Sequence, residues 1–301
     1  MEDNRQFIDV QGLRTHFIAA GVAGQEAVDR PTVILLHGGG IDSARLSWEL
    51  LIPELASTCR VIAPDWPGYG YSAPLDRTCS IEFLVSFLAD FMDALGIQRA
   101  SLAGISMGGG AALGFALRFP ERVDRLVLVD SYGLQRDAPF PLLSYLYVRL
   151  PGVNALTWKL MRSPAMARWT LRSLLRRPGA LTDELFDLVM EEMRRPDAGR
   201  AFMTFQQDEV TLSGTRTSFL DRLTEISAPT LIVHGTLDTL VPHEAVREAH
   251  IRISGSQLYW MEGCGHWPQR DHPAEFNRVA RRFLCENREA GSGLDAPDAS
   301  P

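Results

Sequence analysis

The chain has 301 residues, of which 46% are hydrophobic, so it is long and apolar enough to bury a sizeable core. Its formal net charge of −7 excludes nucleic acid as the expected partner, because phosphate binding depends on clustered positive charge. No apolar run approaches the roughly 20 residues that span a bilayer, and the first residues show no secretory pattern, so we expect a cytoplasmic protein without a membrane span.

The predicted elements begin with an antiparallel hairpin at a sheet edge, formed by residues 7–10 and 15–19. Short β-rich apolar runs follow and predict strands that are buried on both faces. These runs begin at Thr32, Arg60, Ala100, Arg125, Thr230 and Gln257. Helical patterns lie between them, most clearly from Ile81 to Leu95. The alternation predicts a largely parallel sheet with helices on both faces.

The alternation of strands and helices stops between residues 133 and 225, where several helical patterns but no strand are predicted. We therefore assign residues 1–132 and 226–288 to a core domain and residues 133–225 to a helical insertion, the cap. Residues 289–301 are rich in Gly, Ser, Pro, Asp and Ala and are predicted to be a disordered tail.

The four cysteines show neither metal-ligand spacing nor the density of a disulfide scaffold, so we expect free thiols. They are Cys59, Cys79, Cys264 and Cys285.

The pattern Gly104-Ile-Ser106-Met-Gly108 follows a predicted strand and opens a predicted helix. A serine that projects from such a sharp turn needs small residues two positions away on each side, and Gly104 and Gly108 meet that need. The helix start also directs free amides toward the space where an oxyanion would form. We therefore predict Ser106 as a nucleophile and the amide of Met107 as an oxyanion donor.

A second oxyanion donor is predicted in the glycine loop that follows the strand from Thr32. The loop reads His37-Gly-Gly-Gly40, and Gly39 is the first choice, with Gly40 as the alternative. A serine nucleophile also needs a base and a group that orients the base. We predict His266 as the base and Asp238 as the acid that orients it, because each lies just past a predicted strand and the chain order is nucleophile, acid, base. Asp130 also ends a predicted strand and is a rival acid.

Together these motifs resemble the α/β-hydrolase superfamily, as do Asp65-Trp-Pro-Gly68 and Cys264-Gly-His-Trp-Pro-Gln269. The resemblance implies a mostly parallel eight-stranded sheet with flanking helices and a helical lid, which is the cap. Within the superfamily the chain resembles both esterases and the carbon–carbon bond hydrolases of aromatic meta-cleavage pathways. The latter usually carry asparagine before the nucleophile, where this chain has Ile105, and Pro-Gly after the triple glycine, where it has Ile41-Asp42.

The cap supplies many large apolar side chains, which favour a small apolar or aromatic substrate. We expect the substrate to contact Gly38, Gly40, Ile105, Trp158 and Trp267. Residues 138–182 contain seven basic residues and no acidic one. One of these arginines could bind a substrate carboxylate, or the segment could be a solvated face that docks to a partner or an anionic surface.

The sequence thus predicts a serine hydrolase that cleaves an ester through an acyl-enzyme and requires no metal or organic cofactor. Hydrolytic carbon–carbon cleavage of a diketone is the second hypothesis. A slow-turnover receptor is a hypothesis from another class, and an acyltransferase or lyase on the same scaffold stays open. A homodimer is compatible with the sequence.

Overall fold

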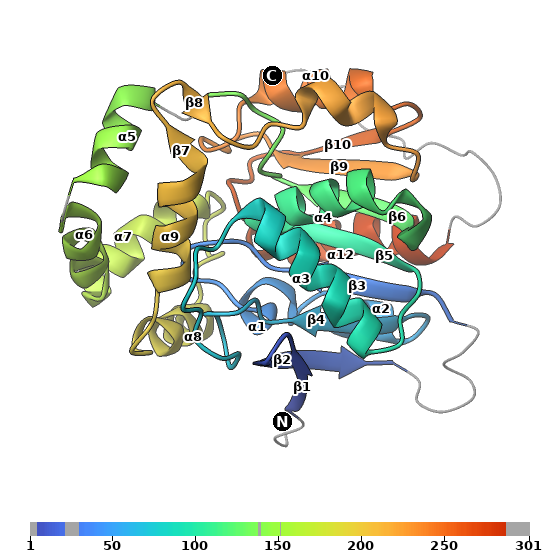
Figure 1. The fold of residues 1–301 in the computed structure, drawn as a ribbon, viewed down its shortest axis with the longest axis horizontal. Coiled ribbons are helices and arrows are strands. Elements are labelled where there is room, and N and C mark those ends of the chain that lie inside the picture. Colours follow the sequence, from blue (N-terminus) through green and yellow to red (C-terminus); the bar gives the residue numbers. More distant parts are fainter. Residues whose placement is uncertain (1–4, 22–29, 138–139, 151, 287–301) are drawn as a thin grey trace.

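The computed structural model describes residues 5–21, 30–137, 140–150 and 152–286. The predicted tail, residues 289–301, lies outside the described residues. An eight-stranded sheet runs through the molecule in the order β1-β2-β4-β3-β5-β6-β9-β10 (Figure 1). Its strands are β1 (Gln6–Val10), β2 (Leu13–Ala20), β3 (Thr32–Leu36), β4 (Arg60–Pro64), β5 (Ala100–Ile105), β6 (Val123–Val129), β9 (Thr230–Gly235) and β10 (Gln257–Met261).

The strand directions agree with the predicted topology. β1 pairs with β2 in an antiparallel register, and β2 pairs with β4 in the same way, so the hairpin predicted at the edge is confirmed. All other neighbouring strands in this sheet are parallel. The carboxyl ends of the parallel strands therefore lie along one edge, which is where a doubly wound sheet places its ligand site.

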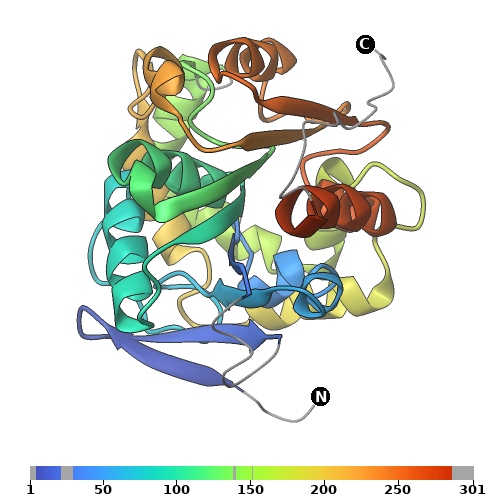
Figure 2. The same cartoon turned by 90° about the vertical axis from the view of Figure 1, so that its right-hand side faces the viewer.

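Alternation along the central strand β3 explains the two helical layers. Ile34 and Leu36 belong to one hydrophobic cluster, whereas Val33 and Leu35 belong to the other. The first cluster packs under α3 (Ile81–Ala94), α4 (Met107–Arg118) and α10 (His243–Arg252). The second packs under α1 (Ala44–Trp48), α2 (Ile52–Ala56) and α12 (Pro273–Arg281). Figure 2 shows α3 and α4 on one side of the sheet and α12 on the other.

Short helical turns complete the core between these elements. They are η2 (Pro120–Arg122), η3 (Leu220–Glu225), α11 (Pro268–Asp271) and η4 (Arg282–Glu286). No helix in the described part of the chain is long and apolar enough to cross a bilayer.

In the described part of the cap segment, five helices gather on one side of the sheet (Figure 1). They are α5 (Pro141–Arg149), α6 (Val153–Met161), α7 (Pro164–Leu174), α8 (Asp183–Met193) and α9 (Arg200–Glu209). The expectation of no strand in this segment was wrong, because β7 (Val210–Thr211) and β8 (Gly214–Thr215) form a small antiparallel pair. Strands of two residues are too short to produce a period-two pattern in the sequence.

A buried carboxylate joins the end of the cap to the core. Glu209, the last residue of α9, accepts hydrogen bonds from the hydroxyl of Tyr132 at 2.9 Å and from the amide of Thr217 at 3.0 Å. The hydroxyl of Thr217 donates a third bond at 2.9 Å. A carboxylate so deeply buried is tolerated because its oxygens are well satisfied, and its bonds fix the last turn of α9 to the loop after β6.

Two of the four cysteines are paired, contrary to the expectation of free thiols. A disulfide joins Cys59, just before β4, to Cys285 in η4, and their Cα atoms lie 6.8 Å apart. Cys79 and Cys264 are free and buried. The pairing could not be read from spacing because 226 residues separate the partners, and only the packing of α12 and η4 against the start of β4 brings them together.

Candidate active site

Ser106 lies in the tight turn between β5 and α4, with φ of 50° and ψ of −119°. A non-glycine residue seldom adopts positive φ, and such strain is typical of turns that project one side chain. A Cβ atom on Gly104 would lie 2.3 Å from the carbonyl oxygen of Gly108, and one on Gly108 would lie 2.3 Å from that of Leu36. Only glycine fits at these two positions, which explains the pattern around Ser106.

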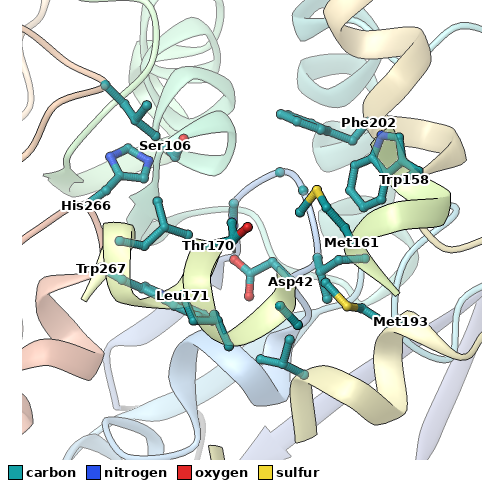
Figure 3. A pocket seen from close by; sticks show the side chains of 18 of the residues that line it. Asp42, Ser106, Trp158, Met161, Thr170, Leu171, Met193, Phe202, His266 and Trp267 are labelled. Carbon is teal, nitrogen blue, oxygen red and sulfur yellow. Dashed lines mark hydrogen bonds between the residues drawn. The ribbon is translucent and has the colours of Figure 1, made fainter. Parts of the chain in front are cut away.

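An imidazole and a carboxylate from two other loops meet beside this turn. Nδ1 of His266, which follows β10, lies 2.8 Å from Oδ2 of Asp238, which follows β9. The amide of Leu240 donates to the other oxygen of Asp238 at 2.7 Å. His266 and Ser106 face the same cavity and lie side by side in Figure 3. Within the described residues no hydrogen bond joins the Ser106 hydroxyl to the imidazole, and such bonds are often long before substrate binds.

The charges around His266 favour its protonated form. Burial lowers the pKa of His266, but the charge of Asp238, the hydrogen bond to it and the charges of Asp130 and Asp42 outweigh burial, so the net shift is upward. Burial raises the pKa of Asp238, but the charge and hydrogen bond of His266 outweigh it and the net shift is downward. His266 is therefore suited to accept a proton while Asp238 stays ionised.

The rival acid Asp130 has a different partner. It lies just past β6, where its Oδ1 accepts a hydrogen bond from the amide of Gly235 at 3.0 Å. The same oxygen lies 2.6 Å from Nδ1 of His234, whose side chain is almost completely buried. Burial raises the pKa of Asp130, although the charge of His234 opposes the shift. Asp130 and His234 thus form a buried pair close to Asp238, and Asp238 is the acid that contacts His266.

Asp130, His234 and Asp238 lie close enough together that they could in principle bind a metal ion. Ligand atoms of Asp130, His234 and Asp238 all lie within 4.8 Å of one another. Each carboxylate already has its own partners, His266 for Asp238 and Gly235 for Asp130. We therefore assign the group to hydrogen bonding and expect no metal to be needed.

A network of hydrogen bonds holds the glycine loop after β3. The amide of Gly38 donates to the carboxylate of Asp42 at 2.7 Å, and the hydroxyl of Ser47 donates to the same carboxylate. The amide of Trp66 donates to Nε2 of His37 at 3.0 Å, and Nδ1 of His37 lies 2.8 Å from the carbonyl oxygen of Gly38. Since the amide of Gly38 is occupied, it is not free to serve as an oxyanion donor.

The amides of Gly39 and Met107 have no acceptor in the described part of the chain. Met107 is the first residue of α4, so its amide is one of the free donors at a helix start. The ring of Phe202 on α9 packs against Gly39 so closely that a Cβ atom there would lie 2.4 Å from it. Gly40 adopts a φ of 74°, which favours glycine.

A cavity of about 270 Å³ opens beside Ser106 and His266, between the core and the cap (Figure 3). All five residues predicted to contact substrate line it: Gly38, Gly40, Ile105, Trp158 and Trp267. The structure adds residues from every cap helix, including Tyr147, Met161, Thr170, Leu171, Leu174, Val189, Met193, Phe202 and Gln206. Most of these side chains are apolar, so the cavity suits an apolar group.

No arginine or lysine lines this cavity within the described residues. The hypothesis that a cap arginine binds a substrate carboxylate therefore finds no support in the structure. Among the described residues, Asp42 is the one carboxylate on the lining. Burial raises the pKa of Asp42, although the charge of His37 and the bonds from Ser47, Ser43 and Gly38 oppose the shift.

Sequence reasoning missed Asp42 and Phe202 as parts of the site. The signal for Asp42 was an acidic residue two positions after the last glycine of the loop, next to Ser43, the N-cap of α1. Phe202 is one of many large apolar residues of the cap, and nothing in a helical pattern tells which of them will meet Gly39. Its position depends on how α9 docks on the core.

Comparison with known proteins agrees with this arrangement. The family model described as the alpha/beta hydrolase fold matches residues 31–273. A 2-hydroxymuconate semialdehyde hydrolase from Pseudomonas sp. (strain CF600) is 34% identical over 263 residues, which cover 84% of this chain and 87% of that protein.

Two solved structures extend the comparison. A meta-cleavage product hydrolase from Pseudomonas fluorescens IP01 superposes with a TM-score of 0.77 at 30% identity and covers 92% of this chain and 96% of its own. A carboxylesterase from Bacillus subtilis superposes with a TM-score of 0.75 at 24% identity and covers 95% of this chain and 92% of its own, a likeness of fold alone.

Proposed function

Because the chain belongs to the alpha/beta hydrolase fold family, we propose that it is a serine hydrolase that cleaves an uncharged, apolar or aromatic ester. The observation that supports this most directly is the 2.8 Å contact of His266 with Asp238 beside Ser106, in a cavity lined mainly by apolar side chains. The chemistry needs no cofactor, because serine, imidazole and carboxylate supply the nucleophile, the base and its orienting group.

In the proposed reaction, the Ser106 oxygen attacks the ester carbonyl carbon while Nε2 of His266 takes the hydroxyl proton. The amides of Met107 and Gly39 stabilise the negative charge that develops on the carbonyl oxygen. Collapse of the tetrahedral intermediate breaks the bond to the alkoxide, which leaves with the proton from His266. Water, deprotonated by His266, then attacks the acyl-enzyme and releases the acid and free Ser106.

Carbon–carbon bond hydrolysis is the second candidate, because the 34% identical relative is a 2-hydroxymuconate semialdehyde hydrolase. A dienoate substrate would bring a carboxylate into a cavity in which the described residues provide Asp42 but no arginine or lysine. An unpaired charge in an apolar site costs several kcal/mol. The lining therefore favours the neutral ester.

We expect a neutral nitrophenyl alkanoate to be hydrolysed with a kcat/KM at least about a hundredfold above that of a matched ester ending in a carboxylate, because the charged end must be desolvated. A ring-fission dienoate, assayed alongside, tests carbon–carbon cleavage directly. Faster turnover of the dienoate than of the neutral ester would replace the first proposal with the second. The Ser106→Ala variant serves as the blank for all three substrates.

We expect the acidic limb of the kcat/KM profile to have its midpoint above pH 6.5, the ordinary pKa of histidine. The reason is that the neighbouring carboxylates raise the pKa of His266. The protonated imidazole, which cannot accept the Ser106 proton, therefore persists to a higher pH, and activity falls as the pH drops through this raised pKa. The profile should be measured with a non-ionising ester, and a midpoint below 6.5 would contradict the arrangement.

A further inference from the structure

Exposed apolar side chains are concentrated on and around the cap helices α5, α6 and α7. Ten of the fifteen exposed large hydrophobic residues in the described chain lie between residues 140 and 169. On α5 and just beyond it they are Phe140, Leu142, Leu143, Leu146 and Leu150; on α6 and α7 they are Val153, Leu156, Leu160, Met166 and Trp169. We call these ten residues the outer cap face. Phe140, Leu142, Leu143 and Leu146 line one shallow hollow together, and monomeric proteins seldom expose large apolar patches without a binding role.

The outer cap face is separate from the catalytic cavity. Tyr147 of α5 and Met161 of α6 face the cavity, whereas Leu142, Leu156 and Leu160 do not line it and are 61%, 57% and 53% exposed. Spacing of three and four residues places Val153, Leu156 and Leu160 on one side of α6. In Figure 1 α5 and α6 lie at the outer edge of the molecule, away from the sheet. The cavity therefore does not account for these apolar residues.

The positive charge of residues 138–182 indicates what kind of surface the outer cap face would bind. Seven basic residues and no acidic one lie between residues 138 and 182, although the whole chain carries a net charge of −7. Arg168 pairs with Asp183. Arg149, Lys159, Arg162, Arg172, Arg176 and Arg177 form no ion pair within the described residues. Arg176 and Arg177 lie beside Asp271 of the core, whereas Arg149, Lys159 and Arg172 lie on α5, α6 and α7 with the apolar residues. A second copy that met these helices with its own would bring positive charge against positive charge, so self-association through them is disfavoured.

An anionic lipid bilayer matches both properties. Its interface accepts leucine and phenylalanine side chains below the headgroups and holds tryptophan, such as the 68% exposed Trp169, at headgroup level. Its phosphates attract arginine and lysine at the edge of the contact. We propose that the outer cap face docks the protein onto the surface of an anionic membrane. This docking does not depend on the Ser106 chemistry.

The test is sedimentation of the full chain with vesicles of phosphatidylcholine alone or mixed with phosphatidylglycerol. We expect pelleting with the anionic vesicles, little with the neutral ones, and release at high salt, because exposed charges are screened. The Leu142→Ser/Leu156→Ser variant should lose most of its binding. The Leu50→Ser/Ile251→Ser variant is the matched control, because it removes two exposed apolar side chains from the surface of the core domain, outside the cap. It should bind like the unaltered protein.

A second variant tests the charges. Arg149→Gln/Lys159→Gln/Arg162→Gln should weaken vesicle binding by at least about tenfold, because each basic residue near an anionic surface contributes about fivefold. Arg99→Gln/Arg118→Gln/Arg252→Gln removes the same charge from core elements and should have a much smaller effect. Thermal melting checks that all variants are folded.

The proposal is overturned if the unaltered chain stays in the supernatant or pellets equally with both vesicle types. Equal binding by the cap variants and their controls would also overturn it. Light scattering provides an independent outcome: a dimer that Leu142→Ser/Leu156→Ser dissociates would show that a second copy, not a membrane, covers the outer cap face.

Discussion

Replacement of Ser106 by alanine is expected to lower kcat by about 10⁶-fold on any ester that the protein hydrolyses, because the acyl-enzyme can no longer form. The loss is large because no other described hydroxyl occupies the turn at the start of α4 beside His266. A fluorophosphonate probe should label the unaltered protein at Ser106 and leave the variant unlabelled. Labelling is read by mapping the modified peptide.

The fold should survive this change. Alanine removes a hydroxyl that forms no hydrogen bond with His266 among the described residues, while the backbone bonds of the turn, such as the bond from the amide of residue 106 to the carbonyl of Val129 at 3.0 Å, stay in place. Positive φ at this position costs alanine about as much as it costs serine. The melting temperature of the variant should therefore stay close to that of the unaltered protein. Full activity in a folded, unlabelled variant would refute the proposed nucleophile.

Replacement of Asp238 by asparagine is expected to lower kcat by about 10⁴-fold, because an amide cannot hold His266 in the tautomer that accepts the serine proton. The same change removes the charge that opposes burial, so the pKa of His266 falls and the acidic limb of the remaining activity moves to lower pH. Both effects are measured from the pH profile of kcat/KM. A loss of activity without a shift of the limb would point to misfolding instead of lost orientation.

Asp130→Asn is the matched control, since it alters the other buried acid at the same sheet edge. Asp130 contacts Gly235 and His234 and does not contact His266, so its loss should cost less than about tenfold in kcat. It should also move the acidic limb downward by less than Asp238→Asn does, because Asp238 contacts the imidazole and its charge raises the pKa of His266 more than the charge of Asp130 does. If Asp130→Asn proves the more damaging of the two in a folded protein, Asp130 is the acid and the assignment is wrong.

The parts of the fold that were predictable are those in which local sequence leaves little choice. Apolar β-rich runs separated by helical periods predicted the parallel sheet, and two short runs at residues 7–10 and 15–19 predicted the edge hairpin, whose turn the structure places at Gln11 and Gly12, both at positive φ. The turn around Ser106 was equally accessible, because close backbone approach requires glycine at 104 and 108. Periodicity and glycine sterics operate over a few residues, so the sequence records them directly.

The site beyond Ser106 was predictable only as a set of candidates. Chain order placed both Asp130 and Asp238 at the ends of neighbouring strands, and only the fold shows that Asp238 reaches His266 while Asp130 turns toward His234. The direction of a side chain beyond a strand depends on loop geometry that no local pattern encodes. The same holds for Asp42, whose bond to the Gly38 amide depends on the path of the glycine loop.

By itself, the sequence determined the sheet and the shape of the serine turn, because both depend on contacts between near neighbours in the chain, and it supplied candidates for the other site residues. Only the tertiary structure decided which acid meets the imidazole, that Cys59 and Cys285 are joined, and that the basic residues of the cap lie outside the cavity. Those outcomes depend on how elements separated by tens to hundreds of residues pack against one another, and packing is a property of the whole chain.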